Sequence, residues 1–417
     1  MNLDSFLREE LKVIDQAVLA GKTQFSFSNF ALNEMLLFSA SENVFFYESK
    51  DCNFSYLGLG ISKEFSPSEV TNYIKSHDHT LVYQGTFEGD TPPKCYLPEW
   101  CFIKKDNNIS LQLFKSQEFN SLSPSKLLFN PHVWESFVGQ WVSYEEMPES
   151  DEWEQMIKEA HRLFNKKELE KIVLSRKKIF TYDEKIELPV MFNSLYHANI
   201  KSSHFSIYHQ FNDHTAFISL TPERLFTLNK KELETISLAG SAPRGVTAIE
   251  DQDFEKNLLT NDRLALEHNL VTHDIKEKLQ YITTSLEISP LITMKLPYIM
   301  HRQAVIKGQI KEDVSPFDLI SVLHPTAAVG GIPSLKAKYK IKEIEKDNRG
   351  YYAAPVGVIS KDFSEIVVGI RSGYIDDQTL TVFGGAGIVP GSSADEEWME
   401  TGIKMQPFVK VINQGVL

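Results

Sequence analysis

Acidic side chains gather near the C-terminal end of the sequence, in the segment SSADEEWMETGIK at 392–404. Ser393 followed three residues later by Glu396 is a capping-box pattern, so we expect a helix to begin there. Glu397 and Glu400 follow within the next turn, and like charges at that spacing repel one another. A hard divalent cation such as Mg²⁺ would relieve the repulsion, because it binds one or two protein carboxylates together with water and substrate oxygens. A solvated acidic face that complements the helix dipole explains the same residues without a metal.

A further acid, Glu267, lies in the middle of the helical segment DRLALEHNLVTHDIKEKL. A charged side chain among apolar residues is costly unless it is paired. It either shares a cation with Glu400 or forms a salt bridge between helices, and the spacing leaves both interpretations open.

Two basic residues lie in strand-like segments. Lys171 opens KIVLSR and is expected on the same side of its strand as Val173. Arg371 lies between Gly369 and Gly373, which leave room for a ligand, and its guanidinium matches the geometry of a carboxylate. Both residues are also explained as cations on a sheet surface, which is the ordinary place for them.

Three glycine-rich turns, at 238–245, 328–333 and 383–391, flank strand-like segments. Turns of this kind present backbone N–H groups that can hold an anion. The third turn lacks the last glycine of the dinucleotide fingerprint, and the sequence contains neither the phosphate loop GxxxxGK[ST] nor the nucleophile elbow GxSxG. The hypothesis of a nucleotide-dependent enzyme therefore rests only on these glycine-rich turns.

The elements that must position these groups are mainly strands that follow one another directly. Strands are expected at 55–62, 79–87, 99–106, 109–114, 171–180, 204–211, 215–220, 365–375 and 378–389, and helices at 145–168, 252–282 and from 393 onward. Strands without intervening helices favour antiparallel pairing, so we predict an α+β fold with one large body. We divide the chain into an N-terminal part of this fold, 1–145, and a catalytic core, 146–412.

Composition restricts the possible partners. The sequence has 43 Lys and Arg against 56 Asp and Glu, a formal net charge of −13, which argues against a nucleic-acid-binding protein. Three cysteines suit a reducing compartment, and no stretch approaches the ~20 apolar residues that a membrane span requires. The first residues form an amphipathic helical pattern without the features of a signal peptide, so we expect a cytoplasmic protein that binds no membrane.

Eight motifs occur in an order that resembles the chorismate-utilising enzymes, the family of isochorismate, salicylate, anthranilate and aminodeoxychorismate synthases. They are KIVLSR (171–176), LTPERL (220–225), SLAGSAPRG (237–245), EHNLV (267–271), LHPTAAVGGIP (323–333), RGYYAAPVG (349–357), VVGIRSG (367–373) and GGAGIVPGSSADEEWMETGIK (384–404). The resemblance covers about residues 150–410, and residues 1–145 match only weakly. It implies two antiparallel sheets packed face to face, with helices outside and the active site in a cleft between the sheets.

The resemblance assigns catalytic and metal-binding roles. It implies that Lys171 is the general base that activates water and that Glu223 is the general acid that protonates the leaving C4 hydroxyl of chorismate. Glu267 and Glu400 match the Mg²⁺ ligands of the family, with Glu397 as a further ligand, direct or through water. A lysine can accept a proton near pH 7 only where its surroundings disfavour the ammonium, and a glutamate can donate one only where they disfavour the carboxylate.

The resemblance also assigns substrate contacts. Two cations match the groups that bind the substrate carboxylates, and His301 matches a histidine near the enolpyruvyl side chain. The remaining contacts come from small residues and backbone groups. The complete set is Arg371, Lys404, His301, Ala328, Gly385, Ala386, Gly387, Gly240 and Ser241.

Residue identities within the motifs favour one branch of the family. Ala239 replaces the lysine of the branch that forms a covalent adduct, and ammonia-using relatives carry Gln at the position of Lys171. Ala328 is the residue that water-using relatives usually have at this position. Ala327 differs from a number of relatives, which have Pro there. We therefore expect Mg²⁺-dependent conversion of chorismate to isochorismate by a monomer or weak homodimer, for menaquinone or siderophore synthesis. Salicylate formation and a catalytically silent chorismate-binding protein are the alternatives.

Overall fold

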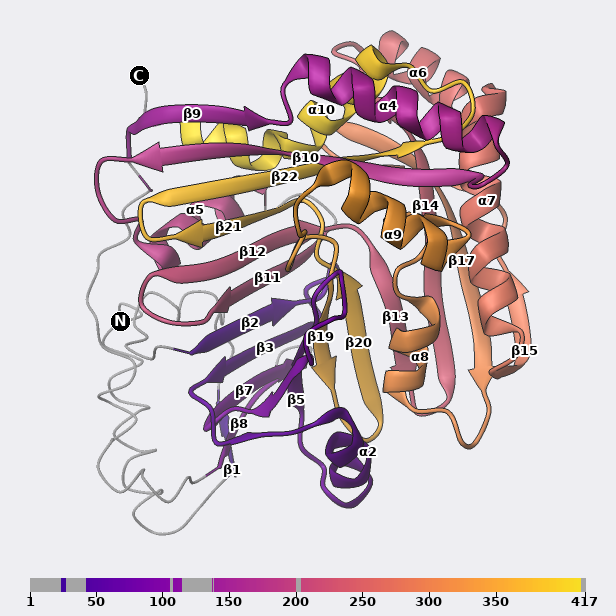
Figure 1. Ribbon diagram of the computed structural model, residues 1–417. Coiled ribbons are helices and arrows are strands. Elements are labelled where there is room, and N and C mark those ends of the chain that lie inside the picture. Colours follow the sequence, from indigo (N-terminus) through magenta and orange to yellow (C-terminus); the bar gives the residue numbers. More distant parts are fainter. Residues whose placement is uncertain are drawn as a thin grey trace.

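The computed structural model describes residues 24–27, 43–105, 108–114, 137, 139–199 and 204–413. The amphipathic helix expected at the N-terminus lies outside these residues. The described chain is built around two large antiparallel sheets, here called sheet A and sheet B, whose strands cross steeply in Figure 1. The α+β prediction is confirmed.

Sheet A contains strands from both ends of the chain. Its order is β1 (Gln24–Phe27), β8 (Asn108–Leu113), β7 (Trp100–Lys105), β3 (Phe54–Leu59), β2 (Val44–Glu48), β11 (Phe205–Gln210), β12 (Thr215–Thr221), β21 (Ser372–Asp376), β22 (Thr379–Ile388), β10 (Lys171–Tyr182) and β18 (Gly331–Ile332). Strand β9 (Trp141–Met147) also pairs with β10.

Sheet B combines strands from residues 224–368 with three short strands from the first hundred residues. Its order is β15 (Thr283–Ile288), β17 (Ile299–Ile310), β14 (Glu232–Pro243), β13 (Arg224–Asn229), β20 (Phe363–Val368), β19 (Pro355–Ile359), β5 (Leu81–Gln84), β6 (Lys94–Leu97) and β4 (Lys63–Glu64). Strand β16 (Ile292–Lys295) pairs with β17. Strands from residues 1–145 thus belong to both sheets.

Helices cover these sheets and connect their strands. Helices α5 (Leu188–Asn199) and α10 (Ala394–Asn413) enclose one apolar core against sheet A, including Phe46, Phe192 and Phe408. A second and larger core lies between the sheets and includes Tyr56 of β3 and Val356 of β19. The remaining helices are α2 (Pro67–Ser76), α4 (Ser150–Asn165), α6 (Ala248–Thr260), α7 (Asp262–Leu279), α8 (Pro316–Leu323) and α9 (Ser334–Glu345).

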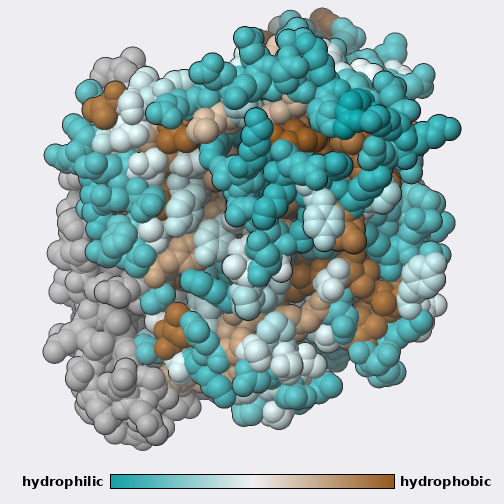
Figure 2. Space-filling model, viewed as in Figure 1, coloured by the Kyte–Doolittle hydropathy of each residue, from teal (hydrophilic) through white to brown (hydrophobic). Residues whose placement is uncertain are grey.

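Hydrophilic side chains cover most of the face shown in Figure 2, and hydrophobic residues appear there mainly in recesses between elements. This distribution agrees with apolar cores enclosed by helices. Within the described residues, no helix combines the length and the apolar character needed to cross a membrane.

The continuous helix expected over 252–282 is wrong. The segment forms two helices, α6 and α7, that meet at Asn261. The Asn261 side chain accepts a hydrogen bond from the backbone N–H of Leu264, 3.1 Å away, and so acts as the N-cap of α7. Asn is among the preferred N-cap residues because its side-chain oxygen satisfies an unpaired N–H of the first helical turn.

The single strand expected over 365–375 is also wrong. Strand β20 ends at Val368 in sheet B, and β21 begins at Ser372 in sheet A. Between them Arg371 has a φ of 49°, in the left-handed region that side-chain-bearing residues seldom adopt. The chain therefore passes from one sheet to the other at this residue.

Candidate active site

A pocket between the two sheets brings together most of the residues expected to form a site. Small-molecule sites have this character, a concave surface with a few converging polar groups. The expected residues that line it are Glu223, Gly240, Ser241, Glu267, His301, Ala328, Arg371, Gly385, Gly387 and Lys404.

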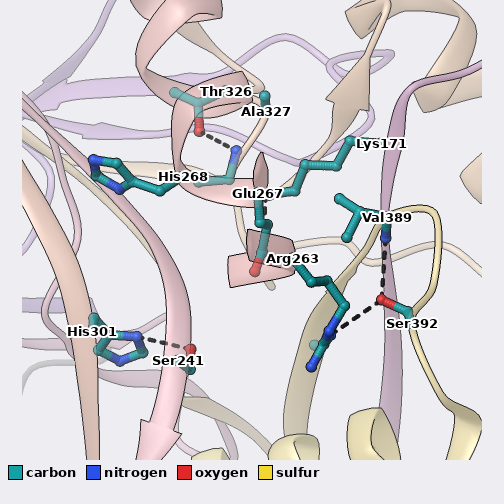
Figure 3. A network of polar contacts seen from close by, with 12 residues as sticks. Lys171, Ser241, Arg263, Glu267, His268, His301, Thr326, Ala327, Val389 and Ser392 are labelled. Atoms are coloured by element: carbon teal, nitrogen blue, oxygen red, sulfur yellow. Dashed lines mark hydrogen bonds and ion pairs between the residues drawn. The ribbon is translucent and has the colours of Figure 1, made fainter. Parts of the chain in front are cut away.

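Lys171, the first residue of β10, is completely buried behind the pocket wall. Its Nζ donates to Oε1 of Glu267 on α7 over 3.1 Å, and Figure 3 shows the two side chains approaching from separate elements. The alternative of a cation on a sheet surface is therefore wrong for Lys171. The salt bridge expected for Glu267 exists, but it joins a helix to a strand rather than to another helix.

Gly387 makes this approach possible. A Cβ atom at this position would lie 2.0 Å from Oε1 of Glu267 and 3.0 Å from Cε of Lys171. The absence of a side chain on β22 thus leaves the space in which the two charged groups meet.

Glu223 lies in the turn between β12 and β13 and is buried. Burial raises the pKa of its carboxyl to about 7, against the opposing effect of Lys171, Lys404, Arg371 and a hydrogen bond with Thr326. A carboxyl with this pKa is partly protonated at neutral pH and can donate a proton. Thr326 was not among the predicted residues, and only its place in the motif LHPTAAVGGIP could have indicated it.

Arg371 presents a guanidinium to the pocket from the crossing between the sheets. The group is buried, and its NH2 donates to Nε2 of His301 over 2.9 Å. Its Nε is buried and has no hydrogen-bond partner among the described residues. Burial lowers the Arg371 pKa to about 10, so the group remains a cation near neutral pH. The sheet-surface alternative is wrong for this residue too.

His301 and Ser241 are opposite each other on neighbouring strands, β17 and β14. A bulge between Leu238 and Ser241 shifts the strand register at this point. Gly240, within the bulge, has a φ of 79°, and a Cβ there would lie 2.9 Å from the carbonyl oxygen of Leu264. The bulge aims Ser241 at His301, so that Oγ lies 2.9 Å from Nδ1 (Figure 3).

Helix α10 contributes a second cation to the pocket. Nζ of Lys404 lies 2.6 Å from Oε1 of Glu400 and donates to the carbonyl oxygen of Gly385 over 2.9 Å. Burial opposes ionisation of Glu400, but Lys404 and a hydrogen bond with Ser241 outweigh it and lower the pKa of this carboxyl.

The direction of the backbone N–H groups along β22 bears on the expected substrate contacts of Gly385, Ala386 and Gly387. The carbonyl of Gly385 points to Lys404, and the N–H of Val173, opposite Gly387, donates to Gly330 on the other side of β10. In a β-strand the N–H and C=O groups of one residue point to the same side of the strand. The N–H groups of Gly385 and Gly387 therefore point away from β10. Ala386 is the exception, because its amide faces β10 and its methyl group lies in the core. We therefore remove Ala386 from the expected substrate contacts.

Three acids form what we call the acidic cluster: Glu267, Glu397 and Glu400. Burial, followed by the charges of Glu400 and Glu267, raises the pKa of Glu397 to about 8. Arg263 on α7 partly offsets this effect through an ion pair of 2.7 Å with Oε1 of Glu397. Arg263 was missed by sequence reasoning, although it lies one helical turn before Glu267 and could have been examined for that reason.

Comparisons with known proteins agree with this geometry. Residues 91–413 match the family model described as chorismate binding enzyme. The chain belongs to the chorismate-binding enzyme family.

Known proteins similar to this chorismate-binding enzyme include isochorismate synthases. The chain is 34% identical over 268 residues to the isochorismate synthase MenF of Bacillus subtilis, and the match covers 63% of this chain but 56% of the relative, about half its length. It is 30% identical to MenF of Haemophilus influenzae, over 85% of this chain and 83% of the relative. The structure of the Escherichia coli menaquinone-specific isochorismate synthase MenF has the same fold, with a TM-score of 0.87, 22% identity and coverage of 96% and 99%.

The acidic cluster of this chorismate-binding enzyme fits a divalent cation by its chemistry. Its donors are carboxylate oxygens, the ligands that Mg²⁺ prefers. Burial is the main cause of the raised Glu397 pKa, and the charges of Glu400 and Glu267 add to it. Within the described ranges no three His, Cys, Asp or Glu side chains surround a common point as a preformed metal site. Glu267 and Glu400, with Glu397, are the residues that would hold Mg²⁺.

The arrangement can support paired acid and base chemistry. Glu223 can donate a proton into the pocket, while Arg371 and Lys404 can hold the carboxylates of a substrate. Lys171, the expected base, lies behind the same pocket and is paired with Glu267. When bound, Mg²⁺ would neutralise acidic charge and withdraw electrons from a substrate carboxylate.

Proposed function

We propose that this chain is an isochorismate synthase that converts chorismate to isochorismate with Mg²⁺. Water adds at C2 of the ring and the C4 hydroxyl leaves as water, with Lys171 as the base and Glu223 as the acid. The observation that carries the proposal is the presence of a buried lysine and a buried glutamate of raised pKa beside one pocket that also holds two cations.

Several relatives support this reaction over others in the family. The curated proteins from Bacillus subtilis and Haemophilus influenzae are both described as isochorismate synthases. Ala328 lines the pocket at the position where the resemblance implies Thr in salicylate-forming and ammonia-using relatives. The product would enter menaquinone or siderophore synthesis, and the protein would act in the cytoplasm as a monomer or weak homodimer.

Product analysis tests the proposal. Purified protein is incubated with chorismate and Mg²⁺, and the products are separated by chromatography. Isochorismate as the main product is expected. Salicylate with pyruvate would assign the chain to the salicylate-forming branch instead. Tight chorismate binding without any turnover would indicate a catalytically silent binding protein.

A further inference from the structure

Residues 326–329, between α8 and β18, form a tight turn, and Ala328 and Val329 of this turn line the active-site pocket. The N–H of Val329 donates to the carbonyl oxygen of Thr326 over 3.1 Å and closes the turn. Ala327 is the second residue of the turn, a position that proline favours because its ring fixes φ. Alanine leaves φ free, so contacts with the surroundings take a larger part in holding this turn.

Ala327 uses the backbone N–H group that a proline would lack. The residue is completely buried, and its N–H donates to Oδ2 of Asp274 on α7 over 3.2 Å. The same oxygen lies 2.9 Å from Nζ of Lys278, one helical turn further along α7. Nζ of Lys278 also donates to the carbonyl oxygen of Pro325 over 3.1 Å. The pair of Asp274 and Lys278 therefore binds the chain on both sides of Thr326.

The end of the turn is attached to other parts of the fold. The carbonyl oxygen of Val329 accepts a hydrogen bond from NH1 of Arg349 over 2.8 Å. The carbonyl oxygen of Gly330 accepts one from the N–H of Val173 on β10 over 2.7 Å. Asp274 thus joins the middle of the turn to α7, while the end of the turn is joined to β10 and Arg349.

Helix α7 contacts two parts of the site from one face. Glu267 precedes Asp274 by seven residues, and residues seven apart lie on nearly the same face of an α-helix. Through Glu267 this face contacts Lys171, and through Asp274 it contacts the turn that lines the pocket. A single rigid element therefore sets the spacing between the proposed base and this part of the pocket wall.

We propose that Asp274 is a positioning residue for the active-site pocket: it holds the turn at 326–329 so that Ala328 takes its place in the pocket wall. Asp274 itself does not line the pocket. The expected effect on turnover rests on the proposed function, but the effects on the turn and on ligand binding do not require turnover. A misplacement of about 1 Å, caused by a mutation away from the chemistry, can lower a rate by about 10²-fold.

Steady-state kinetics with chorismate test the effect on turnover. We expect Asp274→Ala to lower kcat/KM by about 10- to 100-fold. Asparagine keeps a side-chain oxygen that can accept from the Ala327 N–H, so Asp274→Asn should stay within about 3-fold of the wild type. Equal losses in the two variants would overturn the proposal, as would full activity in Asp274→Ala.

Glu277→Ala is the matched control. Glu277 is an exposed carboxylate on the same helix, and it pairs with His273, four residues earlier, at 3.2 Å. The variant removes an ion pair of the same spacing from α7 without touching the turn, so kcat/KM should change by less than about 2-fold. A loss as large as that in Asp274→Ala would assign the effect to the helix and overturn the proposal.

Backbone amide hydrogen exchange tests the contact without chorismate or Mg²⁺. Mass spectrometry follows a peptide that covers residues 326–330. Exchange should be about 5-fold or more faster in Asp274→Ala, because the Ala327 N–H loses its acceptor. Asp274→Asn and Glu277→Ala should exchange like the wild type, and urea titrations show whether global stability is preserved. Unchanged exchange in Asp274→Ala would overturn the proposal.

Chorismate affinity connects the turn to the pocket. Calorimetry without Mg²⁺ should show binding weakened by about 3-fold or more in Asp274→Ala. Faster exchange with unchanged chorismate affinity and unchanged kcat/KM would show that the turn does not shape the pocket, and would overturn the proposal. A wild type that binds chorismate but does not convert it would contradict the proposed function, whereas faster exchange and weaker binding in Asp274→Ala would still support the positioning role.

Discussion

The Nζ atom of Lys171 lies 3.1 Å from Oε1 of Glu267 and joins the first residue of β10 to the middle of α7. One partner is the proposed base and the other a proposed metal ligand. A substitution of Lys171 therefore removes a proton acceptor and also leaves a buried carboxylate without its counter-charge.

Replacing Lys171 with alanine should lower kcat for isochorismate formation by about 10²- to 10⁴-fold, the usual contribution of a positioned acid or base. Lys177→Ala, on the same strand but paired with Asp347 near the surface, is the matched control and should keep kcat within about 2-fold. Circular dichroism confirms that both variants fold. Full turnover by a folded Lys171→Ala protein would exclude this residue as the base.

The pH dependence of activity should reflect Glu223. Because the pKa of its carboxyl is raised to about 7, the protonated form that a general acid requires disappears as the pH rises through about 7. We expect kcat/KM for chorismate to fall above that pH, and Glu223→Gln to lose about 10²-fold or more of kcat. A pH profile that stays flat up to pH 9 would contradict the assignment.

Glu223 should also influence stability in a defined pH range. The raised pKa means that the folded state holds this proton more tightly than the unfolded state, whose carboxyl titrates near 4.5. Its contribution to the free energy of unfolding is complete below about 4.5 and is lost as the pH rises to about 7. Thermal melts of Glu223→Gln should depend less on pH across this range than those of the wild type.

Gly387→Ala should abolish activity through a steric effect. The added methyl group would meet the carboxylate of Glu267 at 2.0 Å and so displace it from Lys171. Gly402→Ala on α10 is the control, since its Cβ would meet only NH2 of Arg176 at 3.4 Å and alanine favours a helix by about 0.5–1 kcal/mol. Steady-state kinetics compare the two. Equal kcat in both variants would show that the Lys171–Glu267 contact is dispensable.

Arg349 should be a major contributor to stability. Its guanidinium pairs with Glu345 at 2.6 Å and donates to the backbone carbonyls of Val173 and Val329, all in a buried region. Arg349→Ala leaves that carboxylate uncompensated and should lower the free energy of unfolding by about 3–5 kcal/mol in urea titrations. Lys158→Ala removes an exposed pair with Glu154 and should cost less than about 1 kcal/mol. Similar losses in the two variants would refute this ranking.

Removal of divalent cations should stop turnover, and added Mg²⁺ should restore it. Glu400→Gln removes a charge from the acidic cluster and should raise the Mg²⁺ concentration for half-maximal activity by about 10-fold or more. Glu396→Gln, on the exposed side of the same helix, should change it by less than about 2-fold. Activity that persists in excess EDTA would remove Mg²⁺ from the proposal.

Residue patterns predict the fold class and most of the strands, because alternation and turn residues depend on local sequence. These patterns fail where a particular hydrogen bond or backbone conformation determines where an element ends. The periodicity of apolar residues continues past Asn261, so the helix break there depends on a capping bond that periodicity does not register. The run EIVVGIRSGYI has uniform strand character, but a left-handed Arg371 divides it between two sheets.

For the candidate site, too, the sequence predicts which residues take part but not what surrounds each of them. Motif order brought Lys171, Glu223, Glu267 and Glu400 into one hypothesis before any geometry was known. Their individual surroundings could not be read in this way, because burial of a lysine depends on partners 96 residues away along the chain. Arg263 and Thr326 acquire meaning only when the fold places them beside Glu397 and Glu223.

The crossing of the chain at Arg371 has a consequence for how the protein acquires its site. Ser241 and His301 belong to sheet B, whereas Gly385 and Gly387 belong to sheet A, and Arg371 lies where one sheet continues into the other. A folding intermediate with both sheets formed but not yet docked would contain every one of these residues and still bind no substrate. Recovery of chorismate binding during refolding therefore reports the docking of the two sheets, a step that the recovery of secondary structure does not reveal.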